Sequence, residues 1–132
     1  MSTKILVVDD EPDFVQLMAY NLSRAGFEVL QATNGLDAVH LARRHVPDVV
    51  LLDVMMPGFD GFSVCEVLGR SPVTSRVPVI LITALDGEKA PSRGMEAGAV
   101  KQLTKPVQLQ TLLATVQEVV KRHRELFSRA GN

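Results

Sequence analysis

The sequence predicts one α/β domain, in which a doubly wound parallel sheet of five strands is covered by five helices in a three-layer arrangement. Two observations lead to this fold class. Short apolar runs, too short for a buried helix, alternate with segments whose apolar residues recur at helical spacing. Strands that alternate with helices pair in parallel, because each helix serves as a crossover connection on a face of the sheet. The length of 132 residues fits a single domain of this kind.

The first half of the chain supplies three strands and two helices. Ile5–Val8 is a continuous apolar run rich in branched residues, which is typical of a strand buried on both faces. Pro12 suits the first turn of the helix that follows, and Gly26 ends it. Asn34 is a good N-cap for the second helix, which ends near Pro47. The other two strands of this half are Phe27–Ala32 and Val49–Leu52.

The second half supplies two more strands. Asp60 and Gly61 precede a helix that runs through Leu68, and the strand Pro78–Ile82 follows it. Val100–Leu103 is a weaker fifth strand. The last helix is predicted to bury an apolar stripe, formed by Leu109, Leu112, Leu113, Val116, Val120 and Phe127.

Composition and charge exclude several classes of protein. Hydrophobic residues make up 46 % and charged residues 22 %, which is incompatible with disorder. The net charge of −1 provides no basic field for nucleic acid or for an anionic membrane surface. The apolar runs are far shorter than the roughly 20 residues of a membrane span. The single cysteine, Cys65, cannot form an internal disulfide, so we expect a reducing cytoplasm.

Polar residues directly follow the predicted strands. They are Asp9 and Asp10, Asp53, Thr83 and Lys105. Ligands of such sheets bind outside the carboxyl ends of the strands, where the strand order reverses. Three carboxylates and one lysine leave two negative charges, which a divalent cation with oxygen ligands such as Mg²⁺ (or Mn²⁺) neutralises. A nucleophilic carboxylate beside a metal, a hydroxyl and an ammonium group is suited to phosphoryl transfer.

Four segments give these residues a known pattern. The chain resembles the receiver domain of two-component response regulators from about Lys4 to Val120. This resemblance implies a flavodoxin-like sheet with the strand order 2-1-3-4-5. The matching segments, in order, are Ile5–Pro12 (ILVVDDEP), Val49–Gly61 (VVLLDVMMPGFDG), Val79–Ala84 (VILITA) and Gly98–Pro106 (GAVKQLTKP).

The resemblance implies a phosphoacceptor and a metal site. Asp53 would accept the phosphoryl group from a phosphohistidine on a sensor histidine kinase or a phosphotransfer protein. Asp10, Asp53 and the backbone carbonyl of Met55 would bind Mg²⁺ directly, and Asp9 would hold a metal-bound water. Such a domain catalyses only its own phosphorylation and dephosphorylation, so it is not an enzyme acting on an external substrate.

The resemblance also implies a switch. Thr83 would bind the phosphoryl group and move, and Lys105 would pair with the phosphoryl oxygens. The bond between Lys105 and Pro106 would be cis. The switched face would recruit a downstream effector or an output domain, and the last two helices and the fifth strand could form a homodimer. We expect no membrane contact and no direct binding of nucleic acid.

Two positions depart from the family pattern. Gln102 stands at the switch position that usually holds Tyr or Phe, so we expect a different or weaker coupling between Thr83 and the output face. Pro91 lies in the segment that is usually helical between the fourth and fifth strands. Since proline is tolerated only in a first turn, we expect this helix to begin near Ala90 and end about Ala97, after a loop at Asp86–Lys89.

Two apolar side chains bear on the lifetime of the phosphorylated state. Met55 and Leu85, each two residues after a site residue, should lean over the phosphoryl group. Neither can orient an attacking water by a strong hydrogen bond. We therefore expect a relatively long-lived aspartyl phosphate.

Two other functions fit a sheet of this kind. A phosphatase with an Asp nucleophile needs a second Asp two residues further on as the general acid. This chain has Met55 at that position, so a phosphatase is disfavoured. A flavin- or nucleotide-binding module needs a glycine-rich or hydroxyl-rich phosphate loop after the first strand, where this chain has Asp9 to Pro12.

The chain divides into a receiver domain at residues 1–120 and a C-terminal extension at residues 121–132. The extension continues the last helix with a basic run and with Leu126 and Phe127. A fraying helix end is one interpretation. The other is an extension that packs on a second chain or starts a linker to an output domain.

Overall fold

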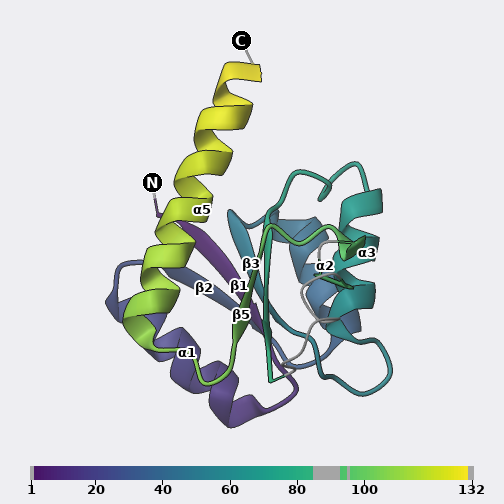
Figure 1. Cartoon of the computed structure of the whole chain (residues 1–132), viewed down its shortest axis with the longest axis vertical. Helices are drawn as coiled ribbons and strands as arrows, with labels where there is room; N and C mark the ends of the chain where they lie inside the picture. The colour runs from purple at the N-terminus through teal and green to yellow at the C-terminus, as the bar shows by residue number, and fades with distance from the viewer. Residues whose placement is uncertain (1, 85–92, 95, 131–132) are drawn as a thin grey trace.

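The computed structural model describes residues 2–84, 93–94 and 96–130, and these form one sheet flanked by helices (Figure 1). The strands are β1 (Lys4–Val8), β2 (Glu28–Ala32), β3 (Val49–Asp53), β4 (Val79–Thr83) and β5 (Lys101–Thr104). The bounded helices are α1 (Pro12–Arg24), α2 (Gly35–His45), α3 (Gly61–Arg70) and α5 (Leu109–Ala130).

All neighbouring strands are parallel, and their order is β2-β1-β3-β4-β5. The chain therefore moves from β1 to one edge of the sheet and then returns past β1 to build the other side. This reversal places the switch point between β1 and β3. The predicted flavodoxin-like order is confirmed.

The sheet is buried on both faces, as its continuous apolar strands require. Because side chains alternate along a strand, Ile5 and Val7 of β1 pack with α1 and α5, while Leu6 and Val8 pack with α2 and α3. Figure 1 shows the two helix pairs on opposite sides of the sheet, which makes the predicted three layers.

Polar side chains begin two of the helices. Asn34 precedes α2, and its Oδ1 accepts a hydrogen bond from the Asp37 backbone N–H at 2.8 Å. Asp60 precedes α3, and its Oδ1 accepts one from the Ser63 N–H at 2.8 Å. Each cap satisfies a backbone donor that has no partner within its helix. The cap predicted at Asn34 is confirmed.

Two expectations need correction. Five helices were expected, whereas four are bounded within the part of the chain that the structure describes. Arg93, Gly94, Glu96 and Ala97 are helical, but the expected start near Ala90, the proline at 91 and the loop at 86–89 lie outside the described residues. Leu109 was expected in the core, but it is 39 % exposed because it opens α5 before the helix reaches the buried stripe that begins at Leu112.

The C-terminal extension is continuous with α5, which reaches Ala130 and projects past the amino-terminal ends of the strands (Figure 1). Side chains anchor the helix at the base of the sheet. Arg124 Nη2 donates to Thr3 Oγ1 at 3.1 Å and lies 3.7 Å from Asp48 Oδ1. Asp48 also accepts from the Lys4 backbone N–H at 2.7 Å, so one carboxylate ties α5 to β1. No helix among the described residues is long and apolar enough to span a membrane.

Val46, at the end of α2, has a strained backbone. Its φ is +45° and its ψ is 68°, a left-handed conformation that a branched side chain disfavours. The side chain is about half exposed, so little packing compensates for the strain.

We expect Val46→Gly to stabilise the domain by about 1 kcal/mol, because glycine adopts this conformation without a Cβ clash. Chemical denaturation measures the change. Val73→Gly is the control, since Val73 is similarly exposed and has no positive φ. If Val46→Gly lost as much stability as Val73→Gly, or more, the backbone strain at Val46 would be small.

Candidate functional site

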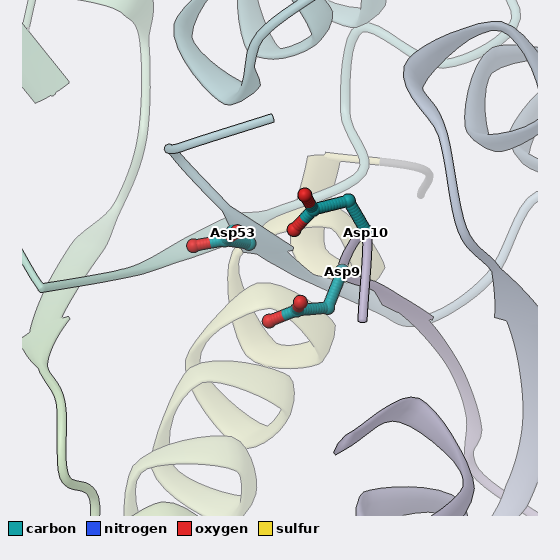
Figure 2. Close-up of side chains that lie close together, drawn as sticks. All are labelled: Asp9, Asp10 and Asp53. Atoms are coloured by element: carbon teal, nitrogen blue, oxygen red, sulfur yellow. The ribbon is translucent and has the colours of Figure 1, made fainter. Parts of the chain in front are cut away.

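Three carboxylates meet at the carboxyl edge of the sheet, beside the switch point. Asp9 and Asp10 follow β1, and Asp53 ends the neighbouring strand β3, with Val8 and Leu52 in register. Figure 2 shows the three side chains converging, and one oxygen of each lies within 4.8 Å of the others. Asp9 and Asp53 are buried, at 1 % and 5 % exposure, whereas Asp10 is exposed.

Lys105 reaches this cluster from the end of β5. Its Nζ donates to Asp9 Oδ2 at 2.8 Å and lies 3.5 Å from Asp53 Oδ1. The ammonium also lies 4.5 Å from the ring centroid of Phe14, a cation–π contact. One lysine thus joins the ends of three strands, β1, β3 and β5.

Thr83 ends β4 and completes the row of strand ends. It is fully buried, and its backbone carbonyl accepts a hydrogen bond from the Lys105 N–H at 2.8 Å. The Lys105–Pro106 peptide is cis, as the resemblance implied. The structure therefore brings Thr83 and Lys105 to the same edge as the three carboxylates.

A loop after β3 forms the open side of the site. A groove of about 480 Å³ lies beside Asp10 and is lined by Met55, Met56, Pro57 and Asp60, among others. Met55 is 57 % exposed, and Leu85 lies outside the described residues. That Met55 and Leu85 both lean over the phosphoryl group therefore stays a prediction.

Gly61 allows helix α3 to start directly against the site. A Cβ at this position would overlap the Asp53 carbonyl oxygen and would lie 2.7 Å from Val54 Cα. The Gly61 N–H donates to the Val54 carbonyl at 3.1 Å. Glycine is required here because backbone meets backbone, and this contact fixes the strand end that carries Asp53.

The charges of the cluster are only partly balanced. Burial and the neighbouring Asp9 charge raise the pKa of Asp53, although Lys105 and the Met55 backbone amide act in the opposite direction. For Lys105, burial lowers the pKa, but the hydrogen bond to Asp9 and the Asp53 charge outweigh it, so the net shift is upward. The protonated lysine cannot neutralise three carboxylates. The residues fit a divalent cation, because each offers a carboxylate oxygen as a metal ligand and these oxygens lie close enough together to bind one ion.

Gln102, at the expected switch position, points inward. Its amide oxygen is buried and has no hydrogen-bond partner among the described residues. A Cβ at Gly94 would overlap this oxygen and would lie 3.2 Å from Leu81 Cδ1, so the amide packs against the helical backbone at Gly94. The different or weaker coupling that we expect between Thr83 and the output face stays a prediction, because it concerns the phosphorylated state.

Sequence reasoning missed two features of the site. The ring centroid of Phe14 lies 4.5 Å from the Lys105 ammonium, and the sequence pattern gave Phe14 no place in the site. Asp60, which caps α3, also lines the groove next to Asp10. A search for aromatic residues in the first turn of the helix after β1 could have found Phe14, but no local pattern predicts its contact with a lysine that follows β5.

The fold and the site define a class of protein. It is a doubly wound α/β domain with strand order 2-1-3-4-5, whose switch point presents buried carboxylates held by a lysine.

The comparisons identify the family within this class. A family model described as the response regulator receiver domain matches residues 5–117. Protein PilH of Pseudomonas aeruginosa is 44 % identical over 117 residues, which are 89 % of this chain and 97 % of PilH. The chain therefore belongs to the response regulator receiver domains of two-component systems.

Two further comparisons agree. Response regulator PleD of Caulobacter vibrioides is 46 % identical over 121 residues, which are 92 % of this chain. The chain spans only 27 % of the length of PleD. The structure of chemotaxis protein CheY4 of Vibrio cholerae matches with a TM-score of 0.86 at 31 % identity, and the match covers 90 % of this chain and 99 % of CheY4.

We expect Asp53→Asn to stabilise the metal-free domain at neutral pH. The folded-state pKa of Asp53 is raised, so folding favours its protonated form and the ionised form opposes folding. The gain should therefore shrink as the pH falls towards the ordinary carboxyl pKa of 3.8, where Asp53 is protonated in both states. Denaturation in EDTA across this pH range measures it.

The matched variant is Asp9→Asn, which should destabilise the domain because it removes the 2.8 Å partner of Lys105. If Asp53→Asn were as destabilising as Asp9→Asn at neutral pH, the proposed charge balance would be wrong.

We expect Gln102→Met to stabilise the domain by about 1 kcal/mol, because an apolar group of similar size replaces a buried oxygen that has no hydrogen-bond partner in the described part of the chain. Gln31→Met on β2 is the control, since Gln31 is exposed. Chemical denaturation should show a gain only for Gln102. A loss of stability in Gln102→Met would mean that the amide has a partner in solution.

Proposed function

We propose that this domain is a phosphorylation-activated receiver, in which Asp53 accepts a phosphoryl group from a histidine kinase or a phosphotransfer protein. The observation that carries the proposal is the buried Asp53 carboxylate, which lies 3.5 Å from a lysine that is itself held by Asp9. Family membership supports the role.

In the proposed reaction, an Asp53 carboxylate oxygen forms a bond to phosphorus while the N–P bond of a phosphohistidine breaks. The electron pair of that bond stays on the imidazole nitrogen, which then takes a proton. Lys105 would balance charge on the phosphoryl oxygens, since its ammonium already lies between two carboxylates of the cluster. The Thr83 hydroxyl would donate a hydrogen bond to the same oxygens.

Asp10, Asp53 and the Met55 backbone carbonyl would bind Mg²⁺ (or Mn²⁺) directly, and Asp9 would hold a metal-bound water. Bound there, the ion would neutralise charge on the transferred group. Asp10 is the exposed carboxylate of the three, so it faces the side from which an ion enters. Lys105 Nζ donates a hydrogen bond to Asp9 Oδ2, which suits an Asp9 that would contact the ion through a water molecule and not directly.

The added charge would shift the domain between two conformations and change the face presented to a downstream effector or output domain. PilH, whose length the chain nearly spans, is a precedent for a receiver without a long additional region. The modification of its own Asp53 would be the only reaction of the domain. Its single cysteine is buried and free, which suits the cytoplasm that we propose as its location.

The direct test uses acetyl phosphate and Mg²⁺ with the full chain. We expect the mass of one phosphoryl group to be added, with peptide mapping locating it on Asp53. Asp53→Asn and EDTA should each abolish the adduct, whereas Asp37→Asn, an exposed carboxylate on α2, should leave it unchanged. An adduct that persists in Asp53→Asn would refute the assignment of the phosphoacceptor.

We expect Met55→Asn and Met55→Glu to shorten the lifetime of the aspartyl phosphate several-fold. The exposed Met55 thioether cannot orient a water molecule, whereas an amide or a carboxylate can. Decay of the phosphoprotein, followed by intact mass after the phosphodonor is removed, measures the rate. Faster decay in the unchanged chain than in both variants would contradict this explanation.

A further inference from the structure

A second groove lies at the opposite end of the sheet from Asp53. It is bordered by residues 75–78 before β4, by residues 98–101 at the start of β5 and by α5 from Glu118 to Phe127. Its volume is about 380 Å³. Figure 1 shows α5 extending beyond this end of the strands, and residues of α5 between Glu118 and Phe127 line the groove.

The base of this groove is apolar. Val77 and Val119 are buried there, and Phe127 is partly buried beside them. Two apolar side chains on the border are open to solvent, Val100 at 50 % and Leu126 at 65 % exposure. An apolar base with exposed apolar edges is typical of a surface that receives an apolar side chain from a partner.

Cations surround this apolar base. Arg76, Lys101 and Arg122 all line the groove, and the only acid lining it among the described residues is Glu118. Glu118 Oε1 lies 3.8 Å from Arg122 Nε, so that carboxylate already has a basic neighbour. The local excess of positive charge contrasts with the net charge of −1 for the whole chain.

Aromatic contacts hold part of this wall in place. The Arg76 guanidinium carbon lies 4.7 Å from the centroid of the Phe127 ring, and the His123 ring centroid lies 4.7 Å from the same ring. His123 Nε2 is buried and has no hydrogen-bond partner among the described residues. The groove thus combines a cation stacked on an aromatic ring with a buried nitrogen that has no hydrogen-bond partner among the described residues.

We propose that this groove binds an acidic segment of a partner protein. The segment would place a large apolar side chain on the base formed by Val77, Val119 and Phe127. Its carboxylates would pair with Arg76, Lys101 and Arg122. This surface lies away from Asp53 and does not depend on the proposed phosphoryl transfer.

The charge pattern disfavours the other occupants. In a two-fold homodimer built on this groove, the patch would face itself and bring like charges together. A nucleic acid would contact the cations through its phosphates but would leave the apolar base uncovered. An acidic peptide with one apolar anchor matches both parts of the groove.

The test is a selection of displayed random peptides on the full chain, run without and with acetyl phosphate and Mg²⁺. We expect the selected peptides to be rich in Asp and Glu around one Leu, Ile or Phe. Their affinity should fall about tenfold or more in the double variant Arg76→Glu/Lys101→Glu. It should not change in the control Arg43→Glu/Arg44→Glu, since both of these arginines are exposed on α2.

Leu126→Ser tests the apolar half of the site. Because Leu126 is 65 % exposed, the variant should fold and should still lose affinity for the selected peptides. The proposal is overturned if neither condition yields a binding peptide, or if binding is insensitive to Arg76→Glu/Lys101→Glu. A dimer in sedimentation experiments that Leu126→Ser dissociates would overturn it as well, because a second copy would then be the occupant.

Discussion

The ion pair between Lys105 and Asp9 is the contact on which the site depends. It joins the end of β5 to the end of β1, two strands that are separated in the sheet by β3 and β4. Asp53 lies within 3.5 Å of the same ammonium, so a single lysine restrains both buried carboxylates. Removing one partner of a buried pair leaves an uncompensated charge, which is costly in a protein interior. The parallel order of the strands is therefore a requirement of the site as well as of the fold.

The same arrangement leaves the cluster short of positive charge. Burial and Asp9 keep the pKa of Asp53 above its ordinary value, and the exposed Asp10 adds a third carboxylate to the edge. A divalent ion would supply the missing charge and would make the site a receptor for a phosphoryl group. The folded domain thus maintains an unfavourable charge distribution at the point where the proposed chemistry needs a cation and an anion to bind.

The carboxylates and the lysine could be located from the sequence because each directly follows an apolar strand, and the carboxyl ends of parallel strands share one edge. The cap at Asn34 is a local feature, so it too could be recognised. Contacts between distant elements could not. The ring of Phe14 beneath Lys105, the inward amide of Gln102 and the groove at the far end of α5 all depend on side-chain packing between segments far apart in the chain. Leu109 shows the same limit, because helical spacing alone does not say where a helix first meets the sheet.

The most direct test of the incomplete charge balance is a titration of the full chain with Mg²⁺, monitored by NMR and calorimetry. We expect one ion per chain, with the largest shifts at residues 9, 10 and 53, and much weaker binding in Asp10→Asn. The absence of Mg²⁺ binding, or binding that is unchanged in Asp10→Asn, would contradict the account of this site.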